Sequence, residues 1–339
     1  MQTTKQWTID DIGPKNLRIG EGRVEEVSGD RILVRTEAVS LNFRDKLVLE
    51  SGMGLPLKFP FIPASDMAGV VEAVGPDVTR FRPGDRVIST FSPEWIDGAG
   101  PGDARTPPYR TRGGYYPGVL AEYSVLPEGW FAAAPSTLDA AEASTLPCAG
   151  LTAWFALIER GRLKAGDKVV VQGTGGVALF GLQIARAHGA EVFITSGSAE
   201  KLDRALALGA DHAINRNDGD WVERLYELTG GYGADHVLEI AGGPHLAQAL
   251  KAVAVNGHIS VIGVLEGFEV SGPAAPLLLK APVVQGISVG HRRALEDFVR
   301  AVDQLRLKPV IDRRYTFKDL PQALDHLDRG PFGKVVIEF

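Results

Sequence analysis

Residues 172–178 combine small side chains at a spacing that suits the binding of a phosphate group. Their sequence, Gln-Gly-Thr-Gly-Gly-Val-Ala, follows the pattern GxGxxA. In that pattern the first glycine allows a tight turn, the second lets the backbone approach a pyrophosphate, and the small last residue lets a helix pack against a strand. We therefore predict a dinucleotide site at this turn. The residues expected to form it are Gly173, Thr174, Gly175, Gly176 and Val177.

A strand and a helix must hold this turn in place. The apolar run of residues 169–171 before it is typical of a buried parallel strand. Apolar residues then recur at helical spacing after the turn, so the helix would offer free amide groups and its positive dipole end to the phosphates. Residues 191–195 predict a second strand about twenty residues further on, as this motif requires.

Length and composition limit the class of protein. A chain of 339 residues exceeds what one hydrophobic core usually serves, so we expect two domains. A net charge of -6 argues against nucleic-acid and membrane-surface partners. Residues 1–10 have no apolar core and no segment approaches 18 apolar residues, so we expect a cytoplasmic protein. Cys148 is the one cysteine, which excludes an internal disulfide.

The pattern of the chain changes near residue 130. Residues 1–130 read as β-rich, and runs 22–27 and 31–36 around a Ser-Gly-Asp turn predict a hairpin. Residues 93–118 form a long segment rich in glycine, proline and aromatic residues, which is either a functional loop or a packed surface excursion. Residues 131–289 alternate strand and helix, which predicts an α/β doubly wound parallel sheet. Residues 290–339 are expected to rejoin the first domain.

Several stretches together resemble the medium-chain dehydrogenase/reductase superfamily, in particular its zinc-free branch of quinone-oxidoreductase-like and enoyl-reductase-like proteins. They follow the order of that family over nearly the whole chain. The resemblance implies a GroES-like catalytic domain, 1–130 completed by 290–339, and a Rossmann cofactor domain, 131–289. The stretches are residues 41–45, 63–71, 82–87, 148–153, the glycine turn and 332–336.

The same resemblance bears on metals. Zinc-using members take their catalytic ligands from positions that here hold Asn42, Ser65 with Asp66, and Cys148. Catalytic zinc needs three ligands drawn from His, Cys and carboxylates, and the structural zinc lobe of the family needs four cysteines. We therefore expect no metal. Cys148 is expected to be a small buried residue rather than a reactive thiol.

The cofactor is expected to be NADP(H). An NAD site usually has an acidic residue at the end of its second strand, but residues 195–198 read Thr-Ser-Gly-Ser. The absence of a carboxylate removes the repulsion of a 2′-phosphate. By resemblance, Lys201 and Arg216 lie where relatives bind that phosphate, and Ser196 could donate a hydrogen bond to it. The alternative is that Lys201 and Arg216 are solvated charges of a helix and a loop.

Other site residues are also assigned by resemblance. Asn42 matches an asparagine beside the nicotinamide, although it could instead cap a helix. Asp45 could orient Asn42 or Arg44, or it could cap the same helix. Ser65 and Asp66 could relay a proton or serve structure. Cofactor contacts are further expected at Thr152, Gly263 and Val264.

Chemistry without a metal favours particular substrates. Hydride transfer leaves negative charge on the substrate, which hydrogen-bond donors must stabilise here. Quinones and α,β-unsaturated carbonyls delocalise that charge, so we expect an NADPH-dependent quinone or enone reductase. The alternatives are an NAD(P)-dependent alcohol dehydrogenase or aldehyde reductase, and a low-turnover NADPH-binding sensor or structural protein. A homodimer is expected from the family, through the edge strand at residues 283–289.

Overall fold

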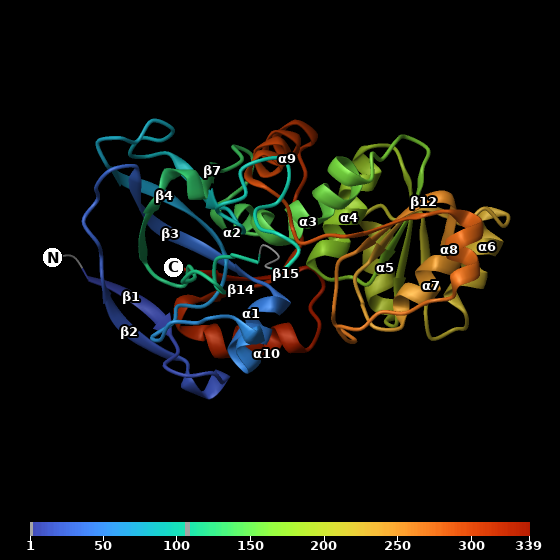
Figure 1. Ribbon diagram of the computed structural model, residues 1–339, viewed down its shortest axis with the longest axis horizontal. Helices are drawn as coiled ribbons and strands as arrows, with labels where there is room; N and C mark the ends of the chain where they lie inside the picture. Colours follow the sequence, from blue (N-terminus) through green and yellow to red (C-terminus); the bar gives the residue numbers. More distant parts are fainter. Residues whose placement is uncertain (1–2, 106–108) are drawn as a thin grey trace. The chain divides into compact units, whose positions relative to one another are not determined.

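The computed structural model divides the chain into two compact units (Figure 1). Unit 1 comprises Met1–Leu151 and Gly290–Phe339, and unit 2 comprises Thr152–Val289. The structure describes residues 3–105 and 109–339. The first boundary lies after residue 151 rather than after residue 130, because the short helix α2 (Ala140–Ala143) packs against β3, β4 and β15 of unit 1.

A seven-stranded sheet forms the body of unit 1 in the described part of the chain. Its order is β14-β15-β3-β4-β5-β7, and β6 also pairs with β3. Strand β3 is buried along most of its length, and its apolar side chains pack in one core with Val335 and Ile337 of β15. The strands of the unit are β1 (Thr3–Thr8), β2 (Arg18–Arg23), β3 (Arg31–Leu41), β4 (Asp66–Val74), β5 (Arg86–Ser89), β6 (Tyr123–Pro127), β7 (Phe131–Ala133), β14 (Ile311–Thr316) and β15 (Lys334–Glu338).

The predicted hairpin of residues 22–27 and 31–36 is wrong. Strand β2 instead pairs with β1 in a separate two-stranded sheet, and β3 pairs with β4, β6 and β15. The Ser-Gly-Asp turn packs against another turn, since the Asp77 amide donates to the Gly29 carbonyl at 3.0 Å. A glycine is needed at position 75 because a Cβ there would lie 2.3 Å from the Gly29 oxygen. Long-range pairing thus overrides the local hairpin pattern.

The helices of unit 1 lie at the ends of its strands and on its sheet. Helix α1 begins directly after β3, and helix α9 has a fully buried apolar face. The helices are α1 (Phe43–Ser51), α2, α9 (Arg292–Leu305) and α10 (Leu320–Asp328), with the short helical turns η1 (Pro14–Asn16), η2 (Gly52–Gly54), η3 (Glu128–Trp130), η4 (Leu146–Gly150) and η6 (Phe317–Asp319).

Unit 2 is the predicted doubly wound fold. Its six-stranded sheet has the order β10-β9-β8-β11-β12-β13, and every neighbouring pair is parallel. Its strands are β8 (Lys168–Gln172), β9 (Glu191–Ser196), β10 (His212–Asn215), β11 (Ala234–Glu239), β12 (Val253–Val261) and β13 (Val283–Gly286). Its helices are α3 (Leu151–Trp154), η5 (Phe155–Arg160), α4 (Gly176–Ala187), α5 (Ala199–Ala207), α6 (Trp221–Thr229), α7 (His245–Ala252) and α8 (Ala274–Lys280).

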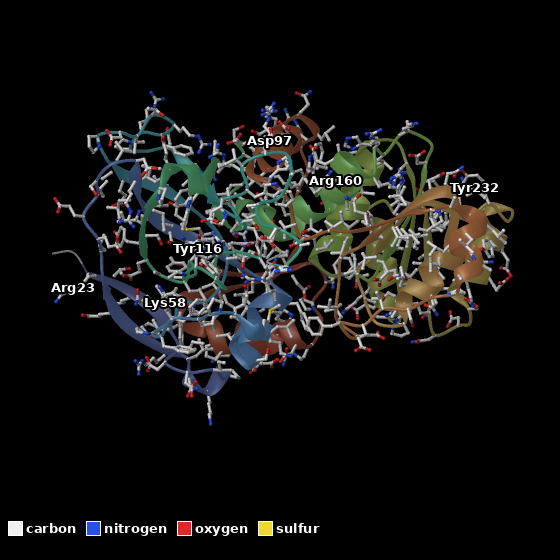
Figure 2. All side chains as sticks on the ribbon, in the orientation of Figure 1. Arg23, Lys58, Asp97, Tyr116, Arg160 and Tyr232 are labelled. Atoms are coloured by element: carbon white, nitrogen blue, oxygen red, sulfur yellow. The ribbon has the colours of Figure 1, made fainter. Side chains whose placement is uncertain are left out.

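The long segment 93–118 packs on unit 1 through its aromatic residues. Trp95 meets the ring of His291 edge-on at 5.4 Å, and Tyr116 lies 4.8 Å from Trp130 between ring centroids. Figure 2 shows Tyr116 within unit 1, where its hydroxyl donates to Glu94. Residues 106–108 lie outside the described residues. Within residues 3–105 and 109–339, no helix is both long and apolar enough to cross a membrane.

Candidate active site

The glycine turn of unit 2 has the geometry that the sequence predicts. Gly173 adopts a φ of +84°, which favours glycine, and Gly175 is the N-cap of α4. A Cβ built on Gly175 would have no atom within 4 Å, so the space beside the backbone is open. Ala178 is buried where α4 packs on the sheet. The turn therefore leaves room for a pyrophosphate next to the free amide groups of the helix.

Of the three residues expected to recognise a 2′-phosphate, Ser196 and Arg216 lie at the ends of two neighbouring strands. Ser196 ends β9 and is paired in register with Asn215, which ends β10. The Arg216 amide donates to the Ser196 carbonyl at 2.9 Å, and Lys201 lies in the first turn of α5. The Arg216 side chain is exposed. Arg216 therefore adjoins a strand end that carries a serine rather than an acid, and Lys201 lies in the helix that follows this strand.

The loops that follow β11 and β12 contact each other at the carboxyl edge of this sheet. Gly263 follows β12, and a Cβ there would lie 1.5 Å from the Ile240 carbonyl oxygen, so no larger residue fits. The Val264 Cα lies 2.8 Å from the position of a Cβ on Gly242. Thr152 is buried in α3 of the same unit. The expected roles of these residues toward the nicotinamide stay predictions.

In unit 1, three adjacent strands bring a polar cluster together at one end of the sheet. In the antiparallel pairing of β15 with β3, Val335 lies opposite Leu41. In the pairing of β3 with β4, Ser40 lies opposite Asp66. The residues that flank these pairs, Lys334 and Asn42, therefore meet beside the start of β4.

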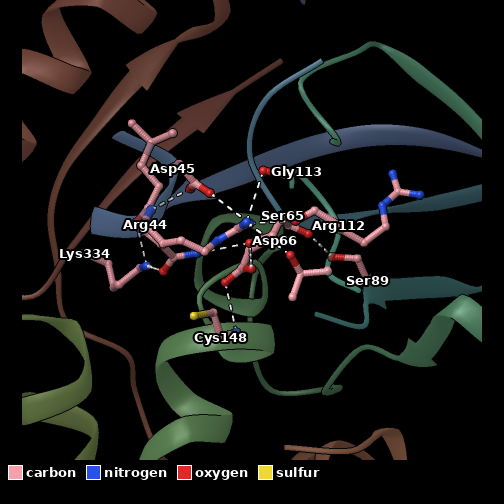
Figure 3. A network of polar contacts seen from close by, with 12 residues as sticks. Arg44, Asp45, Ser65, Asp66, Ser89, Arg112, Gly113, Cys148 and Lys334 are labelled. Carbon is pink, nitrogen blue, oxygen red and sulfur yellow. Dashed lines mark hydrogen bonds and ion pairs between the residues drawn. The ribbon is translucent and has the colours of Figure 1, made fainter. Parts of the chain in front are cut away.

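The cluster is a continuous hydrogen-bonded chain (Figure 3). The Lys334 Nζ donates to Asn42 Oδ1 at 2.5 Å, and Asn42 Nδ2 donates to Ser65 Oγ at 3.4 Å. Ser65 Oγ donates to Asp66 Oδ1 at 2.5 Å. The other Asp66 oxygen accepts the Cys148 backbone amide at 3.0 Å. Asn42, Ser65, Asp66 and Cys148 are thus brought together as the resemblance predicts.

Helix α1 begins with a capping box, in which Asn42 is the N-cap residue and Asp45 is its partner. The Asn42 backbone amide donates to Asp45 Oδ2 at 2.9 Å. The Asn42 side chain also contacts Lys334 and Ser65. Asp45 also pairs with Arg44 at 3.3 Å. It therefore holds the Asn42 backbone and the Arg44 side chain.

The sequence reading missed Lys334 as a site residue. Its side chain is buried, and Nζ donates to the Leu41 carbonyl at 2.6 Å as well as to Asn42. The sequence offered one signal for it. Lys334 directly precedes the apolar run 335–337, which is expected to form a buried strand. A charged residue at that place needs a partner, but the sequence does not say which.

Burial governs the titration of the cluster. It raises the pKa of Asp45 to about 6, against the opposing effect of Arg44. Burial also raises the pKa of Asp66, while the Lys334 ammonium lowers it. The pKa of Lys334 is lowered by burial and raised by Asp66. Burial, then the Asp66 carboxylate, raises the pKa of the Cys148 thiol, so the sulfur stays protonated and unreactive at neutral pH.

One tyrosine of the long segment, Tyr109, meets the ring of Phe91 edge-on at 6.4 Å. Burial raises the pKa of Tyr109, and the neighbouring Arg44 side chain lowers it. Arg44 is itself held by the Arg112 and Gly113 carbonyls at 2.6 and 3.1 Å. Tyr116, in contrast, is engaged by Glu94. Tyr109 and Tyr116 therefore have different polar surroundings, with Arg44 beside the first and Glu94 bonded to the second.

Comparisons with known proteins agree with this organisation. Residues 28–136 match the family model for the alcohol dehydrogenase GroES-like domain, and residues 176–304 match that for zinc-binding dehydrogenases. A zinc-type alcohol dehydrogenase-like protein of Schizosaccharomyces pombe is 36% identical over 97% of this chain and 96% of its own length. The chain belongs to the medium-chain dehydrogenase/reductase superfamily. It is an oxidoreductase of that superfamily.

Other superfamily members extend the comparison. Rat quinone oxidoreductase is 27% identical over 96% of this chain and 94% of its own length. A crystal structure of a putative alcohol dehydrogenase from Sinorhizobium meliloti 1021 is 72% identical, with a TM-score of 0.98 over 100% of this chain and 99% of that one. The superfamily thus offers both quinone and alcohol chemistry as precedents.

The name of the second family model raises the question of zinc, and the residues present do not fit that metal. Asn42 Oδ1 already accepts the Lys334 ammonium, and both Asp66 oxygens accept hydrogen bonds. A fixed ammonium at this place repels a divalent cation. Within residues 3–105 and 109–339, no group of three or more His, Cys, Asp or Glu side chains could hold a metal ion.

Proposed function

We propose that this protein is an NADPH-dependent, zinc-independent reductase of quinones or α,β-unsaturated carbonyls. The observation that carries the proposal is the polar cluster of unit 1, in which an ammonium occupies the neighbourhood where zinc-using relatives need a metal. An organic cluster of this kind can supply hydrogen bonds to a developing oxyanion, but no Lewis acid. Substrates that delocalise charge over a conjugated system need less polarisation than a simple aldehyde does.

The preference for NADPH rests on the residues at the ends of β9 and β10. Ser196 replaces the acidic residue that an NAD site would use, and Lys201 and Arg216 provide positive charge nearby. Arg216 carries a planar guanidinium, which suits a phosphate. A bound NADPH would supply a hydride to the substrate. Residues Gly173 to Val177 would hold its pyrophosphate.

Exposure separates the roles of the cluster residues. Ser65 and Asp66 have no exposed surface, whereas Asn42 keeps 8% of its surface exposed. We therefore assign the substrate contact to Asn42 and its positioning to Asp45, Ser65 and Asp66. The 2.5 Å hydrogen bond runs from Ser65 to Asp66, so it holds these two buried side chains together rather than passing a proton to the surface.

A substrate panel tests the proposal directly. NADPH oxidation is measured with a quinone, an enone, an aldehyde and a series of alcohols, before and after dialysis against a chelator. We expect turnover of the quinone or the enone that survives chelation. Turnover restricted to alcohols, or activity that zinc restores after chelation, would overturn the proposal.

The alcohol dehydrogenase alternative has a specific observation in its favour. The solved structure that is 72% identical to this chain is described as a putative alcohol dehydrogenase. If this chain acts on alcohols, the panel should show a reaction with NADP⁺ and an alcohol that exceeds the reduction of any enone. NADPH binding without turnover of any substrate would favour a sensor.

The proposal includes a homodimer in the cytoplasm. Strand β13 is an edge of the unit 2 sheet, although it ends at Gly286 rather than at residue 289. Val283 and Val284 on it are 45% and 39% exposed. Leu278 and Leu279 of the neighbouring helix α8 are 75% and 81% exposed. An exposed apolar edge invites the pairing of a second copy across a two-fold axis.

A further inference from the structure

Glu239 ends strand β11 with a fully buried carboxyl group. Its Oε1 accepts the backbone amides of Ala241 and Gly242 at 3.0 and 2.8 Å. Its Oε2 is also buried, and among the described residues it has no hydrogen-bond partner. Burying an ionisable group with one unpaired oxygen costs free energy. A loop that needed only a cap would be served by a smaller, neutral side chain, so the acid at this position calls for a further reason.

The place of Glu239 in the sheet supplies one. The chain runs outward from β8 to β9 and β10, and then returns to β11 on the other side of β8. In open parallel sheets a ligand lies in the crevice at such a reversal, outside the carboxyl ends of the strands. Glu239 is the last residue of β11, and Gln172, the last residue of β8, directly precedes the glycine turn. Glu239 therefore lies at a strand end over which a dinucleotide crosses the sheet.

Other unpaired polar side chains gather at the same edge. Leu238 pairs with Val171, so Glu239 is the neighbour of Gln172, and Gln172 pairs with Thr195 of β9. Neighbours in register point to the same face of a sheet. Both polar atoms of the Gln172 side chain and the Thr195 hydroxyl are buried, and none has a partner in the described part of the chain. A sheet edge that served only as core would carry apolar residues, and such departures are expected at functional sites.

The Glu239 carboxyl group holds two loops rather than one. It binds the Ala241 amide, and the carbonyl of the same residue accepts the Glu266 amide at 2.9 Å from the loop after β12. It also binds Gly242, which has a φ of +75°. A Cβ on Gly242 would lie 2.6 Å from the Gly263 oxygen, so the two loops touch through their backbones. A shift of the first loop must therefore move the second loop or break these contacts.

We infer that Glu239 is a positioning residue for the nicotinamide half of the cofactor, because its carboxyl group holds the loop after β11 and, through it, the loop that carries Gly263 and Val264. The inference rests on the proposed function, from which it takes a bound NADPH whose nicotinamide meets the backbone at these two residues. Glu239 has no exposed surface, so it acts through the loops and not by contact with the cofactor. Its substitution should weaken the nicotinamide contacts and spare those of the adenosine half at β9 and β10.

A comparison of two ligands tests this role. They are NADPH and 2′-phospho-ADP-ribose, which is the oxidised cofactor without its nicotinamide ring. Affinities are measured by calorimetry, together with melting temperatures, for wild type, Glu239→Leu and Glu239→Gln. The glutamine is the conservative variant, because its amide oxygen can still accept both backbone amides. Asp235→Leu is the matched control, since Asp235 lies on the same strand at the opposite edge and its carboxylate accepts the Lys168 amide at 2.8 Å.

We expect Glu239→Leu to lower the affinity for NADPH about 10-fold, because the loss of a hydrogen bond to a charged group has about this size. The affinity for 2′-phospho-ADP-ribose should stay within about 2-fold of wild type, as it does for contacts distant from a substitution. Glu239→Gln should retain most of the NADPH affinity. Asp235→Leu should lower the melting temperature and leave both affinities unchanged. Equal weakening of both ligands by Glu239→Leu, or no effect on either, would overturn the inference.

A second measurement uses the wild-type chain alone. Hydrogen exchange is followed by mass spectrometry in peptides covering residues 240–245 and 262–267, without ligand, with 2′-phospho-ADP-ribose and with NADPH. Coupling between sites is reciprocal, so a nicotinamide bound at the second loop must also stabilise the first. NADPH should therefore slow exchange in both peptides, and 2′-phospho-ADP-ribose in neither. Slower exchange in 262–267 alone would refute the coupling.

These experiments separate the failure of the inference from that of the proposed function. If NADPH protects both peptides but no quinone or enone is reduced, the proposed function fails and the positioning by Glu239 stands. If NADH binds in place of NADPH, the same comparison is made with NADH and ADP-ribose, and the same outcomes decide it. If quinones or enones are reduced but Glu239→Leu weakens both ligands alike, the proposed function stands and the positioning fails.

Discussion

The preference for NADPH predicts that removing either cation near Ser196 weakens one cofactor and spares the other. Lys201→Ala and Arg216→Ala each remove a charge that we assign to the 2′-phosphate. A charge-assisted hydrogen bond contributes about 1.5 to 3 kcal/mol, or roughly 10- to 150-fold in affinity. Because the Arg216 side chain is exposed, water and salt reduce the effect, and we expect about 10-fold.

The assay is titration of NADPH and NADH by fluorescence, at low and at high salt. NADPH should weaken about 10-fold with each variant and about 100-fold with both, since independent contacts add. NADH should bind as it does to wild type. Ser196→Asp should reverse the preference, because a carboxylate repels the phosphate and accepts the ribose hydroxyls.

The control is Lys164→Ala. Lys164 is exposed and lies four residues before β8. Its substitution therefore removes a charge of the same sign from the opposite edge of the same sheet. It should leave both affinities unchanged. The reasoning is refuted if NADH and NADPH bind wild type equally well and neither cation matters, or if Lys164→Ala weakens NADPH as much as the two site variants do.

Further predictions concern metal, stability and assembly. Elemental analysis of protein purified without chelators should find no stoichiometric zinc, and one zinc per chain would refute the metal-free site. Burial lowers the pKa of His236 despite its hydrogen bond to Asp167 at 3.2 Å, so its contribution to stability is complete above the unfolded pKa of about 6.5 and is lost as pH falls through the folded value. Urea unfolding between about pH 7.5 and about pH 5 should therefore be less pH-dependent in His236→Asn than in wild type. Gly263→Ala places a Cβ 1.5 Å from the Ile240 oxygen and should lower the melting temperature and NADPH affinity together, whereas an unchanged melting temperature would show that the loop can yield. Light scattering should find a dimer, and Val284→Lys at the edge of β13 should dissociate it; a wild-type monomer at micromolar concentration contradicts the interface.

The sequence determined unit 2 almost completely. The apolar run of β8, the glycine turn and the helix after it are local signals, because each element depends only on the residues that form it. The residue types alone predict the positive φ of Gly173 and the close packing at Ala178. The absence of an acid after β9 could likewise be read directly, because strand, loop and helix are adjacent in the chain.

Unit 1 was read less well because its pairing is not local. The expected hairpin failed since β3 found partners in β4, β6 and β15 rather than in the run before it. The domain boundary moved because α2 packs on strands far from it in sequence. Resemblance identified Asn42, Ser65, Asp66 and Cys148 as belonging together, but not what they do to one another.

The partner of Asn42 was decided by tertiary structure. Lys334 is 292 residues away in the chain, and no local pattern connects the two. Their contact follows from the register of β15 on β3, which the last strand acquires when it returns to the sheet of the first domain. Side-chain chemistry determines which hydrogen bond a lysine and an asparagine can form. The long-range strand pairing brings these two residues together, in a buried place where that hydrogen bond matters.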